Sequence, residues 1–588
     1  MRPMSITIGA KSPNYVKISK VFIKIFSFIV FMNKEQITLI KKLALLNAVK
    51  HDGKANPGAV VGGVLGDFPD LKKDMKSVMQ KINEIAKDVN SKSLEEQEKE
   101  LLKIDEHALD KKEHVVDLFG FLGIKKGEKV RTAFPPGPEK QPHIGHAKAL
   151  LINYLLAEKY GGEFILRFED TNPSLVKEKY YKIMLEQFKW VGAKWKKVVY
   201  ASDYMDLYYK HAEELIKSGD AYMCLASSED IRKSRETGDP LPDRKRSPEE
   251  NLELWKKFPE MKKGEAVLLL KIDLKHKNST MKDPAIFRII DDEHARLGTK
   301  YRVWPNYDFQ NSIMDGYLEI THRIRSKEFE MRNELQRYLQ KLLGYKETHI
   351  YEFARFNMKG VLSSGRVIRE KVESGELIGW DDPTLTTLAA LKRRGFQPEA
   401  IKEFVVKTGI TKNEATLTWD DLIIHNRRFL DDNADRYFFL EEPVEITIHD
   451  APKKKFELNL HPTHRKGGRK FETHDKFLID KNDYDKLKNN KVYRLMECLN
   501  FKSENNVYKY LDDSVTTYKE KGSRMLHFLP VSEKNVPVTI MMPDKAIIKG
   551  LAEPGVKNIK EGDVIQFERF GFARLDNKET MTFWYTHK

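Results

Sequence analysis

Arg131-Thr-Ala-Phe-Pro-Pro-Gly-Pro-Glu-Lys-Gln-Pro-His143-Ile-Gly-His146 is the stretch that decides the fold of this 588-residue chain. Its prolines fix φ and lack an N–H, so the segment is expected to form a stiff loop and not a central strand. Residues 147–160 are helix formers with an apolar majority, and Gly161-Gly162 ends them. The loop therefore brings His143 and His146 to a helix N-terminus.

A helix N-terminus that follows such a loop is suited to a polyphosphate. Free N–H groups and the helix dipole favour negative charge there, and two imidazoles can donate to phosphate oxygens. Gly145 has no side chain, so a base or ribose could approach the backbone. These features favour ATP. Two histidines beside a proline-rich loop could equally be surface groups without a task, and a metal site is disfavoured because no further Cys or His completes a ligand set nearby.

Phe134-Pro-Pro-Gly-Pro138 followed by His143-Ile-Gly-His146 resembles the ATP-binding signature of class I aminoacyl-tRNA synthetases of the glutamyl/glutaminyl subgroup. Glu163-Phe-Ile-Leu-Arg-Phe-Glu-Asp-Thr-Asn-Pro173 is similar to the next block of that subgroup, and the resemblance covers most of the chain. It implies that ATP is bound here by Pro136, Gly137, Pro138, His143, Gly145 and His146.

The short apolar run Phe164–Phe168 is typical of a buried parallel strand. With the strand before the helix it makes a right-handed βαβ unit, the half of a Rossmann-like sheet that binds nucleotides at strand C-terminal ends. Glu169 then emerges at the ligand edge of the sheet. An ordinary loop acid is the alternative, and the resemblance makes Glu169 a candidate to bind the α-ammonium of an amino acid.

The segment from Trp304 to Arg325 is similar to the second half of the family's catalytic domain. Tyr307 aligns with a tyrosine that contacts the amino acid. Arg325 stands where glutamate-specific members have arginine and glutaminyl enzymes have a small uncharged residue, and a guanidinium binds a carboxylate better than a neutral amide. The resemblance therefore favours glutamate, although Arg325 lies between Arg323 and Lys327 and could also contact RNA from the surface.

The run Ser363-Ser-Gly-Arg366 occupies the place of the family's second signature, a loop that contacts ATP phosphates. The resemblance implies ATP contacts from Ser363, Ser364, Gly365 and Arg366, and it makes His143, His146, Ser364 and Arg366 the catalytic candidates. Gly365 stands where the family has its phosphate-contacting lysine. Lys359, Arg366 and Arg369 all remain possible sources of the missing cation.

A second departure from the family is Ala133, which stands where an amino-acid-binding arginine is usual. Arg131 is the nearest basic residue, and residues two apart in an extended segment point to the same side. We therefore predict that Arg131 contacts glutamate, with a plain surface contact as the alternative.

Composition and cysteine content agree with a nucleic-acid partner in a reducing compartment. The formal charge is +15, the pI is near 9.2, and 40% of residues are hydrophobic, which suits several globular cores and an anionic partner. Cys224 and Cys498 lack a Cys-x-x-Cys pattern, so no structural zinc and no disulfide framework is expected. The run Val21–Met32 imitates a signal peptide but is too short to span a bilayer. Met32 is therefore interpreted as the natural start, with a peripheral membrane anchor as the alternative.

Periodicity and the resemblance together give the domain order. Apolar residues recur at helical spacing after Glu35, and period-two runs such as Val444-Glu-Ile-Thr-Ile448 predict β-structure towards the end, as in the archaeal/eukaryotic branch. The expected class is α/β, a Rossmann-like catalytic domain between helices and antiparallel β-barrels. The segments are a non-native or disordered extension (1–31), an α-helical appended domain (32–112), the first catalytic half (113–220), an acceptor-end-binding insertion (221–300), the second catalytic half with the ATP loop (301–370), a helical connector (371–434) and anticodon-binding barrels (435–588).

The resemblance implies a complete reaction. Glutamate and ATP, with Mg²⁺, would form glutamyl-adenylate, and the glutamyl group would pass to the 3′ end of tRNA for glutamate. The chain is expected to be a cytoplasmic monomer without a membrane partner. Glutaminyl-tRNA synthesis and a non-catalytic tRNA-binding paralogue are the alternatives; Gly365 and Ala133 suggest the second, whereas the intact histidines argue against it.

Overall fold

The computed structural model describes residues 32–51, 53–105, 108, 117–505 and 507–588. The chain divides into two compact units, Met1–Val115 and Val116–Lys588. The interpretation of residues 1–31 as an extension lies outside the described residues. Among the described helices, none combines the length and the apolar character needed to cross a membrane.

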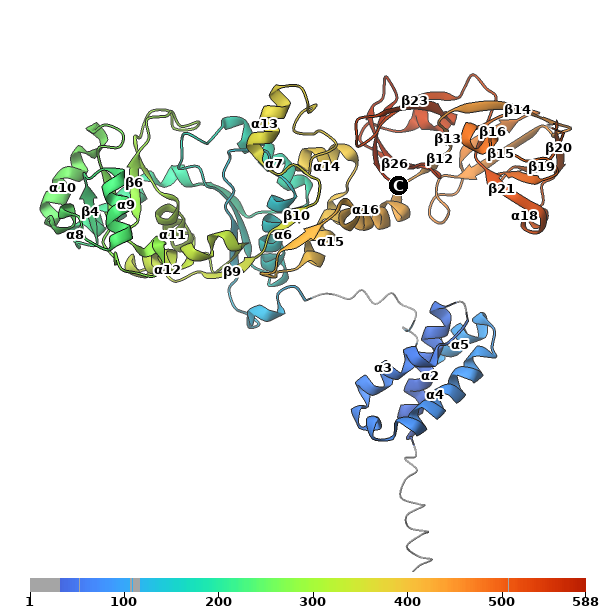
Figure 1. Ribbon diagram of the computed structural model, residues 1–588, viewed down its shortest axis with the longest axis horizontal. Helices are drawn as coiled ribbons and strands as arrows, with labels where there is room; N and C mark the ends of the chain where they lie inside the picture. The colour runs from blue at the N-terminus through green and yellow to red at the C-terminus, as the bar shows by residue number, and fades with distance from the viewer. Residues whose placement is uncertain (1–31, 52, 106–107, 109–116, 506) are drawn as a thin grey trace, which may run out of the picture. The chain divides into compact units, whose positions relative to one another are not determined.

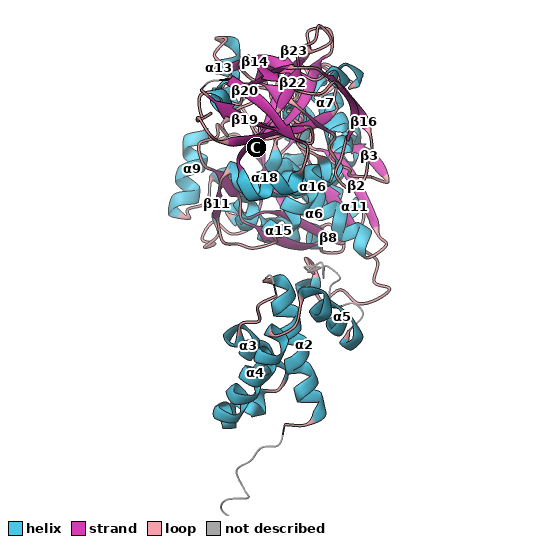
Figure 2. Ribbon diagram, turned by 90° about the vertical axis from the view of Figure 1, so that its right-hand side faces the viewer, coloured by secondary structure: helices cyan, strands magenta, loops and turns pink. Residues whose placement is uncertain are grey.

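The first unit is made of helices (Figures 1 and 2). Apolar residues at helical spacing form its core, which includes Ile40, Val64, Val78 and Leu101. Side-chain caps fix the helix starts, as where Asp74 accepts a hydrogen bond from the Ser77 N–H. The α-helices are α2 (Lys34–Lys50), α3 (Pro57–Asp67), α4 (Met75–Asn90) and α5 (Leu94–Ile104).

The second unit begins with a five-stranded parallel sheet in the order β3-β2-β1-β8-β9. Thr132 of β1 pairs with Phe164 of β2 on one side and with His322 of β8 on the other. The strand order therefore reverses between β1 and β8, the switch point where open α/β sheets bind ligands. The strands are β1 (Arg131–Phe134), β2 (Glu163–Phe168), β3 (Lys197–Tyr200), β8 (His322–Ser326) and β9 (His349–Phe353).

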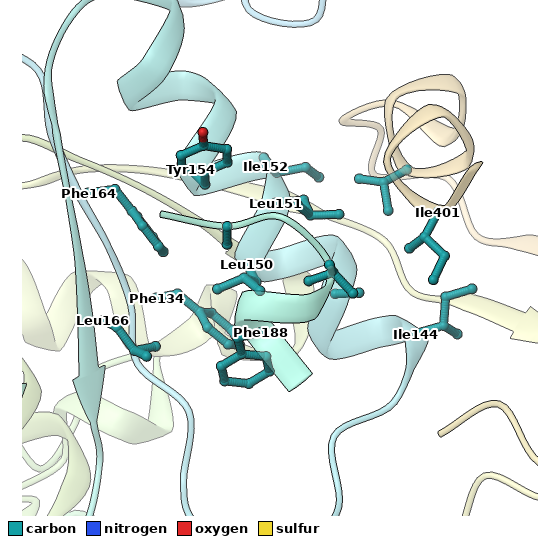
Figure 3. Packing of buried hydrophobic residues seen from close by; sticks show 14 of the residues in the cluster. Phe134, Ile144, Leu150, Leu151, Ile152, Tyr154, Phe164, Leu166, Phe188 and Ile401 are labelled. Atoms are coloured by element: carbon teal, nitrogen blue, oxygen red, sulfur yellow. The ribbon is translucent and has the colours of Figure 1, made fainter. Parts of the chain in front are cut away.

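Helix α6 (Ile144–Lys159) joins β1 to β2 and is buried along most of its length. Leu150 and Leu151 pack among Phe134, Leu166 and other residues of the sheet and of the helices around it (Figure 3). A Cβ at Gly162 would lie 2.0 Å from the Val130 carbonyl oxygen, so the turn from α6 into β2 requires glycine. Helices α7 (Glu178–Trp190) and α8 (Met205–Lys217) follow β2 and β3.

A four-stranded antiparallel sheet, β4-β5-β6-β7, is inserted between β3 and β8. Helices α11 and α12 then lead to β8 and β9. The elements are β4 (Ala221–Cys224), α9 (Ser228–Thr237), α10 (Pro248–Lys257), β5 (Val267–Leu270), β6 (Ala285–Ile289), β7 (Val303–Pro305), α11 (Tyr307–Tyr317) and α12 (Asn333–Leu342).

After β9 comes a helical connector that packs on the catalytic core. Ile401 of α15 faces the α6 cluster in Figure 3. At its other end, Arg393 pairs with Asp576 and buried Arg394 donates to the Thr586 carbonyl, both in the C-terminal region. The elements are β10 (Phe356–Met358), α13 (Gly365–Glu373), α14 (Leu388–Arg394), α15 (Pro398–Thr408), β11 (Ala415–Leu417) and α16 (Trp419–Asn433).

The C-terminal region holds two seven-stranded sheets and a two-stranded hairpin. Most pairs are antiparallel, as predicted, but each large sheet also contains parallel pairs, such as β14 with β20 and β23 with β27. The strands are β12 (Arg436–Tyr437), β13 (Phe439–Leu440), β14 (Pro443–His449), β15 (Lys454–Asn459), β16 (Gly468–Thr473), β17 (Lys476–Asp480), β18 (Val492–Leu495), β19 (Leu499–Glu504), β20 (Val507–Asp512), β21 (Gly522–Leu526), β22 (Phe528–Pro530), β23 (Val536–Met541), β24 (Ile547–Ala552), β25 (Val564–Phe567), β26 (Gly571–Asn577) and β27 (Thr582–His587), with short helices α17 (Lys481–Tyr484) and α18 (Val515–Lys521). The predicted class, parallel α/β between helices and a β-rich end, is confirmed.

Candidate active site

A cavity of about 680 Å³ opens at the C-terminal edge of the parallel sheet. The last residues of β1, β8 and β9, namely Phe134, Ser326 and Phe353, line it. Ten of the residues singled out from the sequence meet there: Pro136, Gly137, His143, Gly145, His146, Glu169, Tyr307, Arg325, Ser363 and Gly365. Pro138, Ser364, Arg366 and Arg131 are not among its lining residues.

The two histidines form an interlocked pair at the start of α6. The His143 Nδ1 accepts a hydrogen bond from the Gly145 N–H at 3.0 Å, and the His146 Nδ1 accepts one from the His143 N–H at 3.2 Å. A ring nitrogen that accepts from a backbone N–H carries no proton, so in each neutral ring the proton lies on Nε2. Each imidazole therefore offers one N–H donor.

Both rings stay neutral well below pH 7. Burial lowers the pKa of His143 to about 4, with smaller contributions from the charges of Lys140 and Arg355. Burial also lowers the pKa of His146, assisted by His143 and Lys140. Both side chains are half-buried and line the cavity, so the donors act in a partly desolvated place, where hydrogen bonds to an anion are stronger than in water.

Gly145 serves this pair directly. A Cβ at Gly145 would lie 2.8 Å from Cε1 of His143 and 3.0 Å from its Nδ1. Glycine therefore makes room for the His143 ring, a different reason from the approach of a base or ribose that the sequence suggested.

Main-chain hydrogen bonds hold the loop before α6 against the segment before α14. The Ile144 N–H donates to the Thr386 carbonyl at 3.0 Å, and the Leu388 N–H donates to the Pro142 carbonyl at 2.9 Å. His143 and Thr387 face each other as an antiparallel bridge. Segments far apart in the sequence thus form one wall of the cavity.

Glu169 enters the cavity from a buried charge network. Its Oε1 accepts from Arg167 at 2.9 Å and from the Asn311 amide at 3.1 Å, whereas its Oε2 is buried without a partner among the described residues. Burial raises the pKa of Glu169, and the charge of Arg167 opposes that rise. A poorly solvated carboxylate with one free oxygen is a site for a cationic group.

Asp315 and Arg323 complete this network and balance its formal charge. Asp315 accepts from Arg167 at 2.7 Å and pairs with Arg323 at 2.5 Å. Both arginines are almost fully buried. Two guanidinium groups and two carboxylates, those of Glu169 and Asp315, cancel in formal charge, so the network adds no net charge to the cavity wall.

Arg325 is the exception to this balance. Its side chain is buried and donates to Asn333 and to the Phe329 carbonyl, and Asn333 in turn donates to Glu352. Its Nε and Nη1 have no partner among the described residues, and it forms no ion pair there. Burial, together with the charge of Arg323, lowers its pKa to about 10. An unpaired buried guanidinium beside a cavity favours an anionic ligand.

The structure does not bring Arg131 to the cavity, so its predicted contact with glutamate is not supported. Arg131 begins β1, whereas the cavity lies at the other end of that strand. Its guanidinium pairs with Glu163 at 2.7 Å and with Glu319 at 2.9 Å. Arg131 and Ala133 do share a side of the strand, but the two-residue offset moves Arg131 about 7 Å away from the ligand edge.

The loop of residues 363–366, called the phosphate loop because it was predicted to contact ATP phosphates, lies only partly at the cavity. Ser363 and Gly365 line the cavity, while Arg366 is exposed and lies 3.5 Å from Glu370. Lys359 and Arg369, the other two cations considered from the sequence, are also exposed and outside the lining.

Several residues at this site were missed from the sequence. They are Lys140, Lys148, Arg167, Asn311, Asp315 and Arg323. Arg167 carried a usable signal, because a charged residue inside the apolar strand Phe164–Phe168 must have a buried partner. Its partners are Glu169, two residues further along the chain, and Asp315 of α11, and no local pattern pairs α11 with β2.

Comparison with known proteins places these features in one family. The family described as tRNA synthetases class I (E and Q), catalytic domain, matches residues 129–432. Two families described as tRNA synthetases class I (E and Q), anti-codon binding domain, match residues 434–521 and 525–576.

Relatives in archaea match along almost the whole chain. The "Glutamate--tRNA ligase" of Pyrococcus abyssi is 39% identical over 95% of this chain and 100% of its own. That of Methanothermobacter thermautotrophicus is 36% identical over 94% and 99%. A solved glutamate tRNA ligase from Elizabethkingia meningosepticum covers 52% of this chain and 70% of its own at 20% identity, with a TM-score of 0.40, too low to support a comparison of folds. From its catalytic domain to its C-terminal domains, the chain therefore belongs to the class I tRNA synthetases of the E and Q family.

Proposed function

We propose that this chain is a glutamate–tRNA ligase, which activates L-glutamate with ATP and transfers the glutamyl group to the 3′ end of tRNA for glutamate. Its family uses ATP, and its full-length archaeal relatives carry the name of this activity. The observation that favours glutamate within the cavity is Arg325, a buried cation without a carboxylate partner among the described residues.

In this proposal the amino acid is held by two opposite charges. The glutamate side-chain carboxylate accepts from the free Nε and Nη1 of Arg325, and the α-ammonium donates to the free Oε2 of Glu169. Glutamine would offer a neutral amide to the same guanidinium, so the positive charge of Arg325 would stay uncompensated. Tyr307, at the start of α11, lines the cavity beside both groups.

Activation then needs no side-chain nucleophile. A glutamate α-carboxylate oxygen attacks the α-phosphorus of ATP, the bond to the bridging oxygen breaks, and pyrophosphate leaves with the electron pair. The Nε2–H groups of His143 and His146 donate to phosphate oxygens on which charge accumulates. The loop and α6 hold these donors before the substrates arrive, so the protein contributes mainly position and charge.

In the second step a hydroxyl of the terminal ribose of tRNA attacks the acyl carbon, and AMP leaves. Nucleic acid is the partner expected from the anticodon-binding families and from the charge of +15. We propose that the insertion from β4 to β7, next to the catalytic sheet in sequence, receives the acceptor end.

We further propose that Mg²⁺ arrives with ATP and is held by its phosphate oxygens. The described residues contain no cluster of three or more His, Cys, Asp or Glu side chains that could bind a metal ion. In the part of the chain that the structure describes, the cavity wall presents cations, imidazole donors and only two carboxylates, those of Glu139 and Glu169, which fits a metal that the nucleotide carries. Bound there, Mg²⁺ would neutralise phosphate charge.

The test is ATP–pyrophosphate exchange in the presence of tRNA, with glutamate and glutamine in parallel. Glutamate should support exchange, and Arg325→Cys should lower its kcat/KM by about tenfold or more, because a charge-assisted hydrogen bond is worth roughly 1.5 to 3 kcal/mol. Arg337→Cys, on the exposed side of α12, is the matched control and should not change it. Equal or better use of glutamine by the unmodified protein would refute the proposal.

A further inference from the structure

The phosphate loop lacks a cation at the position where one is expected. By the resemblance, Gly365, which begins α13, stands at the place of the family's phosphate-contacting lysine, and Arg366 is exposed and absent from the cavity lining. Departure of pyrophosphate leaves negative charge on the oxygens next to this loop. The histidines supply hydrogen bonds but no charge, because both are neutral.

Lys140, from the loop before α6, reaches this gap. A Cβ placed at Gly365 would lie 3.5 Å from Cδ of Lys140, so the lysine stem runs beside the space in which a side chain at position 365 would begin. Lys140 lines the cavity and, within the described part of the chain, forms no ion pair and donates no hydrogen bond. Its charge contributes to the lowered pKa of both His143 and His146, which places it near the two donors.

The other basic residues of the lining are less suitable. Arg355 already pairs with Glu328. Lys148 is buried with its Nζ 4.9 Å from the ring centre of Phe353 and 5.3 Å from that of Phe356. Burial lowers the pKa of Lys148 to about 8. Arg288 of β6 also lines the cavity, and its side chain has no hydrogen bond or ion pair among the described residues, but it is not among the atoms nearest to Gly365. Lys140 is thus the lining cation whose stem lies beside Gly365.

We propose that Lys140 is a catalytic residue that takes over the task of the missing lysine: it donates to the β- and γ-phosphates of ATP and stabilises the pyrophosphate as it leaves. When the α-phosphorus bond to the bridging oxygen breaks, that oxygen keeps the electron pair, and the Lys140 ammonium compensates its charge without losing its proton. This inference rests on the proposed function, because it assumes that ATP is cleaved at the α-phosphorus.

Equilibrium dialysis with ATP, inorganic pyrophosphate and adenosine tests the proposal without any amino acid. Lys140→Ala should bind ATP and pyrophosphate about tenfold or more weakly, the usual cost of a charged hydrogen bond, and bind adenosine as before. Lys140→Arg should restore most of the affinity. Lys359→Ala removes an exposed lysine of the same loop region outside the lining and should change nothing.

A double variant that moves the lysine from position 140 to position 365 makes the test more specific. The double variant Lys140→Gly with Gly365→Lys moves the cation to the other loop and should recover pyrophosphate affinity and the exchange rate lost in Lys140→Ala. Unchanged binding in Lys140→Ala, or an equal loss for adenosine, would overturn the role of Lys140. Lys140-dependent pyrophosphate binding in a protein that supports no exchange with glutamate would instead overturn the proposed function and leave the role of Lys140 in place.

Discussion

Histidine plays two unlike parts in this chain, and both depend on burial. At the start of α6, neutral rings with Nδ1 occupied by backbone N–H groups leave Nε2–H donors, which the proposed function assigns to a phosphate. In the C-terminal region, His527 stacks on Phe438 with ring centres 4.7 Å apart, and its Nε2 has no partner among the described residues. The first arrangement favours a ligand, and both arrangements make folding sensitive to pH because each lowers a histidine pKa.

His527 makes one contribution to the pH dependence of stability, beside those of other histidines whose pKa burial lowers. Its pKa falls from 6.5 to about 3, first because of burial and then because of the charges of Arg569 and Arg469. Between these values the unfolded chain binds the proton and the folded chain does not, so stability is present above pH 6.5 and is lost as the pH falls towards 3. The contribution of His527 to the slope is at most about 1.4 kcal/mol per pH unit.

We predict that His527→Phe reduces the loss of stability between pH 7 and pH 4, because the unfolded chain then has one fewer site to protonate. Thermal midpoints of the variant and the unmodified protein at several pH values measure the effect. The exposed His474 provides the control, since His474→Gln should leave the pH dependence as it is. Parallel curves for His527→Phe and the unmodified protein would contradict the prediction.

At the scale of elements, the short helix α14 connects the loop before α6 with the C-terminal region. Thr387, its N-cap, belongs to the segment bonded to the loop before α6, and Arg394, its last residue, is buried against β27. Arg394 donates to the carbonyls of Thr586 and Pro383 and lies 4.4 Å from the ring centre of Trp419. It therefore joins the connector to the C-terminal region without any carboxylate.

We predict that Arg394→Ala lowers the free energy of unfolding by roughly 3 kcal/mol, since it removes hydrogen bonds from a charged donor and leaves buried carbonyls unpaired. Thermal or chemical denaturation measures the change. Arg428, an exposed arginine of α16 that pairs with Glu403, is the matched control, and Arg428→Ala should cost less than about 1 kcal/mol. Similar decreases in the free energy of unfolding for the two variants would refute the proposed connecting role of buried Arg394.

The sequence predicted those elements whose signals are local. The proline-rich loop, the apolar helix after it and the Gly161-Gly162 break were sufficient to predict the loop, α6 and β2. Parallel pairing of β14 with β20 could not be anticipated, because alternation along a strand does not reveal the direction of its neighbour. The proximity of Lys140 to Gly365 was also missed, because the two residues lie on loops more than 200 residues apart in the sequence.

At the scale of the whole molecule, the two units have separate cores. The core of the first unit contains residues between Met32 and Ala108, and the cavity of the second is lined by residues between Phe134 and Thr387. None of the described residues of the first unit lines that cavity.

We therefore predict that a chain beginning at Asp117 keeps tRNA-dependent ATP–pyrophosphate exchange with glutamate, with KM values for ATP and glutamate unchanged. Exchange kinetics of the shortened and the full chain make the comparison, and circular dichroism checks that the shortened chain is folded. A folded but inactive product would show that the helical unit completes the active site.

The main-chain bonds at Ile144 and Leu388 have an evolutionary consequence. They join peptide groups, so almost any side-chain replacement leaves them intact, and proline is the replacement that removes the donor. The backbone therefore holds the loop before α6 in place while the charged residues around the cavity are free to change. A lineage could therefore change the side chains of the loop that carries Lys140 without releasing that loop from the segment before α14.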